Sequence, residues 1–173
     1  MQKVKIPVSL DLYKAAQQRL HYEGIVPPKD LPRLVEAVVN VERDVDVKIE
    51  CGVDEQGLLF IKGKASAEVT TTCQRCNNDM KLDLASDFAF SPVKEEDEDD
   101  ELLPERYEPL ELERFDEIDL KRLVEDELIL ALPLIAMHDD ADCNASQQDM
   151  SWGEIEEEEK PNPFDVLKQI KRN

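Results

Sequence analysis

The chain has 173 residues and a formal net charge of −20, from 21 basic and 41 acidic side chains. This length suggests one domain with a tail, and it is long enough to bury a core without disulfides. The longest apolar run, residues 128–136, is far shorter than the ~20 residues that a membrane-spanning helix needs. The N-terminus lacks an apolar secretion signal, so we expect a cytoplasmic protein that does not bind membranes. Its four cysteines are then expected to be thiols or metal ligands.

The negative charge is concentrated in the second half of the chain. Residues 1–94 carry 13 basic and 14 acidic side chains, whereas residues 95–173 carry 8 and 27. Two acidic runs, residues 95–101 and 154–159, account for much of the difference. Such runs are typical of solvated loops, but they also suit an attraction for a basic partner or the mimicry of nucleic acid. Their sign excludes direct binding to RNA phosphates.

A strand and a helix are predicted at the N-terminus. Residues 4–8 form a short edge strand in this interpretation, because the proline within them cannot donate to a central ladder. Ser9 or Asp11 is a suitable cap for a helix that runs to about Tyr22 and stops at Gly24.

The rest of the first half predicts an antiparallel, barrel-like β-meander and therefore an α+β fold. Apolar and polar side chains alternate with the period of two that marks half-buried strands. The alternating stretches are residues 45–53, 59–73 and 80–90. Residues 54–57 supply a turn between the first two of these strands.

A second helix is predicted near residues 117–131, after an acidic connection at residues 94–115. Asp116 or Asp119 can cap this helix, its apolar residues follow the helical period, and Pro133 ends it.

The last residues, 160–173, predict a short basic C-terminal helix with one apolar face. Such a segment can be a docking peptide for a partner, or it can pack on its own domain. The candidate binding residues in this tail are Phe164, Lys168, Lys171 and Arg172. We therefore expect one α+β domain over residues 1–150, with an acidic loop at about 94–108, followed by an acidic linker and basic tail over 151–173.

A candidate metal site combines two distant parts of the sequence. Cys73-Gln-Arg-Cys76 lies between two predicted strands, and a hairpin turn lets both sulfurs of this spacing face one metal ion. His138 and Cys143, just beyond the second helix, supply a possible second half. Three thiolates and one imidazole would complete a tetrahedral structural zinc site. The halves are 61 residues apart, so they meet only if the fold brings them together.

The remaining chemistry-bearing residues give no support for an enzyme. Cys51 lies on the apolar side of its predicted strand and is interpreted as a small buried hydrophobe, and His21 as a surface or capping residue. The sequence has no glycine-rich phosphate loop, no serine-centred elbow and no helical histidine pair, so no small-molecule substrate is indicated. A thiol or hydrolytic enzyme that uses Cys73 and Cys76 stays open as an alternative.

Three motifs in this order resemble the YceD family of large ribosomal RNA subunit accumulation proteins. They are Cys-Gln-Arg-Cys at residues 73–76, the stretch 111–133, and Lys-Pro-Asn-Pro-Phe at 160–164. The resemblance implies a bacterial, non-enzymatic factor for the synthesis, processing or stability of large-subunit (23S) ribosomal RNA. Many relatives carry a second cysteine pair at the positions that match His138 and Cys143. The resemblance thus implies either a zinc ligand set or a lineage that lost the metal and kept the fold.

Two modes of contact with assembly intermediates follow from the charge. The near-neutral first half can present a basic patch to large-subunit ribosomal RNA, from Lys62, Lys64, Arg75 and Lys81, and the tail is a second candidate. Alternatively, the acidic segments hold a basic ribosomal protein, and we expect this protein contact to come first. A further alternative is an acidic binding module or chaperone for a basic protein unrelated to ribosomes.

Overall fold

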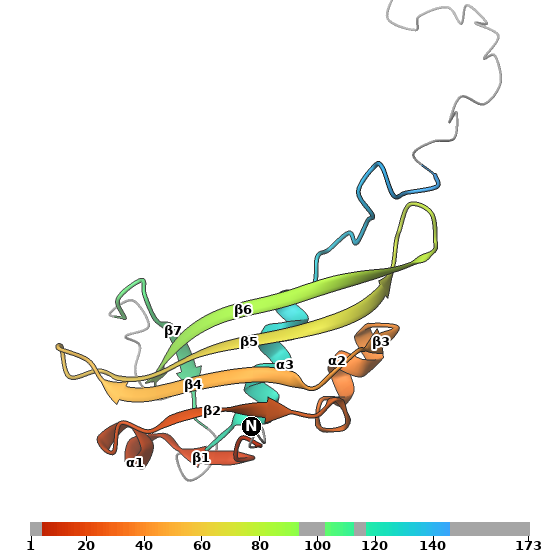
Figure 1. The fold of residues 1–173 in the computed structure, drawn as a ribbon. Coiled ribbons are helices and arrows are strands. Elements are labelled where there is room, and N and C mark those ends of the chain that lie inside the picture. The colour runs from red at the N-terminus through yellow and green to blue at the C-terminus, as the bar shows by residue number, and fades with distance from the viewer. Residues whose placement is uncertain (1–4, 94–102, 113–116, 146–173) are drawn as a thin grey trace, which may run out of the picture.

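The computed structural model describes residues 5–93, 103–112 and 117–145, which form an α+β fold around a curved sheet (Figure 1). The order of strands in the sheet is β2 (His21–Val26), β4 (Val45–Val53), β5 (Leu59–Thr72), β6 (Asp79–Val93) and β7 (Glu108–Glu111). The short β3 (Asn40–Val41) also pairs with β5. Neighbouring strands are antiparallel, except that β7 runs parallel to β6. β1 (Ser9–Asp11) and β8 (Glu117–Asp119) form a separate antiparallel pair.

The predicted meander is present, but the prediction that it closes like a barrel is wrong. Among the described residues, β2 and β7 lie at opposite ends of the strand order, so the sheet is open. Short helices line its apolar face instead of a second wall of strands: α1 (Leu12–Gln17) and α3 (Leu120–Leu130) pack against the strands, and α2 (Pro32–Ala37) packs against α3. None of the helices in the described ranges is long and apolar enough to cross a bilayer.

Alternation along the strands sends one set of side chains into the core. In β4 the side chains of Val45, Val47 and Ile49 are fully buried, while Lys48 and Glu50 are exposed on the outer face. The amphipathic α3 packs against β5 and β6 on the inner face and buries Leu120, Leu123, Val124 and Leu128. The three predicted strands of the meander are thus confirmed as β4, β5 and β6, with small differences at their ends.

The N-terminal predictions need correction. The predicted helix is confirmed in its start, since the Asp11 carboxylate accepts the Lys14 N–H, but it ends at Gln17 rather than near Tyr22. Arg19 then takes a left-handed φ of 51°, which ends the helix and turns the chain into β2. The predicted strand at residues 4–8 is reduced, among its described residues, to a single bridge between Lys5 and Ile25.

Other elements differ in the second half and around residues 28–37. The helix predicted near 117–131 is α3, capped by Asp119, and β8 occupies its first predicted residues. β7 lies within the predicted acidic connection, which the structure describes only at residues 103–112. The 3₁₀ turn η1 (Pro28–Asp30) and α2 were not predicted. The predicted C-terminal helix lies outside the described residues.

Candidate metal centre

The turn of the long β5–β6 hairpin presents the first two cysteines. β5 and β6 extend beyond the neighbouring strands, and their turn lies at the far end of this arm (Figure 1). Within the turn, Cys73 N–H donates to the Asn78 carbonyl at 2.8 Å, and Asn77 N–H donates to the Cys73 carbonyl at 2.9 Å. Asn77 adopts φ 59°, a left-handed conformation that asparagine tolerates better than most residues. The turn thus holds Cys73 and Cys76 on one side of the arm.

The segment after α3 runs along the arm and delivers the other two side chains (Figure 1). Gln74 N–H donates to the Ala136 carbonyl at 2.8 Å, which ties this segment to the hairpin turn. Cys143 N–H donates to the Asp139 carbonyl at 3.1 Å and closes a turn that directs Cys143 inward. The fold therefore brings together two parts of the sequence that share no local element.

The four candidate ligands form one cluster. The three sulfurs and one ring nitrogen of Cys73, Cys76, His138 and Cys143 all lie within 4.8 Å of one another. Tetrahedral zinc with sulfur at ~2.3 Å and nitrogen at ~2.0 Å requires donor atoms roughly 3.3–3.8 Å apart. Cys76 Sγ is already 3.3 Å from His138 Nδ1. A small closure of the cluster would complete a four-coordinate shell, so these residues can bind a metal ion such as zinc.

The surroundings of His138 fix which ring nitrogen faces the cluster. Its Nε2 lies 3.2 Å from the backbone carbonyl of Asp79, and a carbonyl can only accept, so Nε2 carries the proton. Nδ1 is thus the ring nitrogen that faces Cys76, and in the neutral ring it is the atom available as a ligand. Metal-bound histidines commonly donate their second N–H in this way, which sets the ring orientation.

The electrostatics of the cluster favour a thiolate at its centre. Burial raises the pKa of the Cys73 thiol, but hydrogen bonds from the backbone N–H groups of Cys76, His138 and Arg75 outweigh burial and lower that pKa to about 5. The Cys73 sulfur in turn raises the pKa of the His138 ring. A buried thiolate ringed by backbone donors is a better metal ligand than a neutral thiol.

The other cysteine and histidine behave as the sequence predicts. Cys51 is buried in β4, and burial raises the pKa of its thiol to about 11, so it is a neutral hydrophobic group. His21 is exposed, although it lies on β2 rather than on a helix.

The predicted basic residues do not gather into one patch. Lys62 and Lys64 lie on the outer face of β5, whereas Lys81 is opposite Thr70, which is about 20 Å along the sheet from Lys64 at ~3.3 Å per residue. Arg75 lies in the hairpin turn. The tail candidates Phe164, Lys168, Lys171 and Arg172 lie outside the described residues.

Three of the four described candidates lie beside an acid. Lys64 pairs with Asp87 at 3.0 Å and Lys81 with Glu68 at 3.6 Å. Arg75 pairs with an exposed aspartate of the segment after α3 at 2.5 Å. Acidic neighbours reduce the positive potential that each cation offers to RNA.

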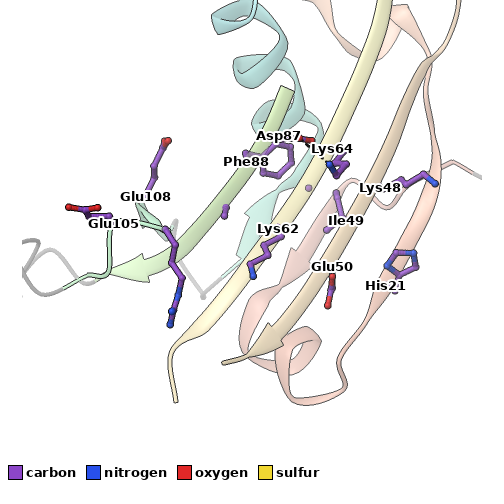
Figure 2. Close-up of a pocket in the computed structure, with 13 residues that line it drawn as sticks. His21, Lys48, Ile49, Glu50, Lys62, Lys64, Asp87, Phe88, Glu105 and Glu108 are labelled. Atoms are coloured by element: carbon purple, nitrogen blue, oxygen red, sulfur yellow. Dashed lines mark hydrogen bonds and ion pairs between the residues drawn. The ribbon is translucent and has the colours of Figure 1, made fainter. Parts of the chain in front are cut away.

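A hollow of about 500 Å³ lies on the outer face of the sheet, over β4, β5 and the chain before β7 (Figure 2). Lys62 and Lys64 line it together with Glu50 and Asp87, so its rim carries both signs of charge. Because side chains of both charges line the hollow, it does not favour an anionic ligand over a cationic one.

An aromatic cluster beside this hollow was not predicted from the sequence. The rings of Phe60 and Tyr107 stack with centroids 6.1 Å apart, and Lys62 Nζ lies 4.6 Å from the centre of the Phe60 ring. Arg106 lies 5.0 Å from the centre of the Tyr107 ring. The residues come from β5 and from the chain before β7, and no local spacing links these two parts of the sequence.

Comparisons with known proteins agree with the resemblance in the sequence. Residues 61–171 match the family model described as Large ribosomal RNA subunit accumulation protein YceD. A protein of that name from Haemophilus influenzae is 48% identical over 174 aligned residues, which cover 99% of each chain. The chain belongs to the YceD family. All four candidate ligands of this YceD chain fall within the matched range. No solved structure matches the chain.

Proposed function

We propose that this YceD chain is a non-enzymatic ribosome biogenesis factor that supports the synthesis, processing or stability of 23S ribosomal RNA by binding assembly intermediates. The observation that carries the proposal is the 48% identity, over 99% of both chains, to a relative named for large ribosomal RNA subunit accumulation. The aligned range spans the metal centre, the sheet and the C-terminal segment together.

The first contact in this proposal is with a basic ribosomal protein, and contact with RNA comes second. A net charge of −20 repels bare RNA over a screening distance of about 8–10 Å at physiological salt. Acidic neighbours beside Lys64 and Lys81 support this order, because they reduce the positive surface that RNA could approach. The acidic residues 95–101 and 154–159 are the candidate binding segments for the basic protein.

Zinc has a structural role in this proposal. A closed set of three thiolates and one imidazole leaves no open position for a substrate or an activated water. Bound zinc would supply a fixed cross-link between the β5–β6 hairpin and the segment after α3. The chain's own residues supply the donors, and the Asp79 carbonyl orients the imidazole.

The test is affinity capture of the tagged full chain from gently lysed cells, with and without nuclease. The proposal expects precursors of 23S ribosomal RNA and large-subunit proteins in the untreated sample, and basic ribosomal proteins that remain after nuclease. A matched pair of variants replaces the acids of 95–101, or those of 154–159, with their amides, and shows which run holds the protein.

Two results would count against the proposal. Tight, salt-sensitive binding of the pure chain to naked ribosomal RNA contradicts the protein-first order. Captured partners without ribosomal components favour the alternative, an acidic binding module for another basic protein, which the charge of −20 also suits.

A thiol enzyme predicts that C73S together with C76S abolishes an activity without loss of stability, whereas the structural site predicts loss of stability.

A further inference from the structure

Exposed apolar side chains extend from the last residue of α3 to the metal centre. Leu130 is 78% exposed, Leu134 97%, Ile135 60% and Met137 44%. These four residues, here called the apolar segment, fall within eight positions of the sequence. Scattered exposed hydrophobics are ordinary, but several exposed apolar side chains this close together in the chain suggest an interaction surface.

Contacts with the β5–β6 hairpin turn hold the apolar segment in its exposed position. Ala136, in the middle, is buried, and its carbonyl accepts the Gln74 N–H at 2.8 Å. The Leu134 carbonyl accepts the Gln74 side-chain amide at 3.4 Å. Arg75 approaches Met137 Sδ at 3.7 Å. With its backbone fixed to the hairpin turn, the segment directs Leu134 and Ile135 into solvent.

Acidic side chains continue the same surface. Asp139, Asp140 and Asp142 follow the apolar segment directly, and all three are exposed. The Asp140 side chain is 86% exposed even while it pairs with Arg75. The surface therefore offers apolar contacts beside negative charge, and the peptide that suits it is apolar on one face and basic on the other.

We propose that residues 160–173 of this chain dock on the apolar segment. They carry Phe164, Leu167 and Ile170 at the spacing of one helical face. Their basic residues are Lys160, Lys168, Lys171 and Arg172, against a single acid, Asp165. Apolar side chains cover Leu134 and Ile135, and the cations face the aspartates that follow.

The distance along the chain favours this occupant over a separate protein. The described chain ends at Ala145, two residues after the last ligand of the metal centre. Residues 146–159 reach at most roughly 45 Å when extended, at ~3.3 Å per residue. A tethered segment that can reach its site has an effective concentration on the order of millimolar, which a free peptide of the same affinity does not match.

Docking would make the tail and the apolar segment mask each other. A partner that binds the basic tail then uncovers the apolar segment, and a partner that binds the apolar segment releases the tail. This inference goes beyond the proposed function and does not depend on ribosomal RNA or on any particular partner.

The test is photo-cross-linking of the full chain with p-benzoylphenylalanine in place of Leu134. An equal mixture of isotopically light and heavy chains, analysed by mass spectrometry, separates links within one chain from links between chains. The expected result is a link within one chain to a peptide from 160–173. Adding F164D lowers its yield about tenfold or more, because burial of an aromatic side chain is lost.

Position 53 is the matched control site. Val53 is a large hydrophobic residue, 39% exposed, at the end of β4 away from the metal centre. The same photoreactive group at position 53 should give no link to the tail. Links only between chains, links only to other proteins in a lysate, or a yield that F164D does not change would each overturn the proposal.

Discussion

Glu125 is a buried carboxylate that joins two helices. Its side chain is 7% exposed, and one carboxylate oxygen accepts the backbone N–H groups of Arg33 at 2.7 Å and Leu34 at 3.1 Å. These donors lie in the first turn of α2, where Leu31 supplies no side-chain cap. Arg33 also pairs with the second carboxylate oxygen at 3.5 Å. The N-terminus of α2 is thus capped from α3, across 91 positions of sequence.

Replacing Glu125 with alanine should therefore destabilise the whole fold. E125A leaves two donors of α2 without an acceptor, which costs roughly 1–3 kcal/mol in the free energy of unfolding. E125Q keeps an acceptor and should lose less. D126A is the matched control, because Asp126 pairs with the same arginine at the surface and such pairs contribute about 0–1 kcal/mol. Urea unfolding curves measure all three, and equal midpoints for E125A and D126A would contradict the capping role.

Gly63 is required by the ring that packs over it. It lies directly opposite Phe88 in the β5–β6 ladder, and a Cβ at Gly63 would be 2.1 Å from the Phe88 ring. G63A forces the ring or the strand to move, which costs about 1–3 kcal/mol in overpacking. F88L in the same chain should recover part of the lost stability. Thermal melting of the two single variants and the double variant tests this, and strictly additive losses would show that the two sites do not interact.

At the scale of elements, we predict that the hairpin arm depends on metal binding by Cys73, Cys76, His138 and Cys143. Removing metal with a chelator should lower the melting temperature and speed amide hydrogen exchange at residues 73–78 and 134–143. Exchange in β4, which is deep in the sheet, should change much less.

The control for chelation is C51A, which removes a buried thiol that is not part of the cluster. Its melting temperature should differ from that of the native chain by the same amount with and without chelator. If the purified protein contains no metal and chelator leaves its melting temperature unchanged, zinc has no place in the proposed function.

The strands were predictable where one face of the sheet is buried and the other is wet. Val45, Val47 and Ile49 alternate with polar residues, and that period alone identifies β4. α2 and β2 were not predictable in the same way. α2 has a single fully buried side chain, Leu34, and is capped from a distant helix, so its own six residues carry little helical signal. The predicted helix runs to about Tyr22 and so overlaps the start of β2, because the alternation in β2 is weak and the break at Arg19 is set by backbone conformation.

The metal centre was predictable in its residues but not in its contacts. The spacing of Cys73 and Cys76 indicates a turn that presents two sulfurs, and the family resemblance points to His138 and Cys143. No sequence pattern shows that the Asp79 carbonyl orients the imidazole, because that carbonyl lies in the next strand. The exposure of Leu134 was not predictable either, because an apolar run beside a helix is typical of a buried core.

For the whole molecule, acid should destabilise the fold through paired carboxylates. Hydrogen bonds from lysines lower the pKa values of three carboxylates, Asp11 from Lys14, Glu23 from Lys48 and Asp30 from Lys121. A lowered pKa in the folded state gives stability that is present above the unfolded pKa, about 4, and is lost as the pH falls below it. The melting temperature should therefore fall steeply below about pH 4.

The variant D30N separates this effect from the general loss of charge. It removes the pairing between η1 and α3 at 3.0 Å. D30N should be less stable than the native chain near neutral pH, and the difference should shrink as the pH falls through the lowered pKa of the native Asp30 carboxylate. A difference that is constant across the pH range would contradict the assignment.

The wide separation of the four ligands also orders events during synthesis of the chain. Cys73 and Cys76 leave the ribosome long before His138 and Cys143, and every described strand and helix lies ahead of His138. A metal ion held by all four residues could therefore be bound only after every described strand and helix has been synthesised, so occupancy of the site would mark a chain that already contains these elements.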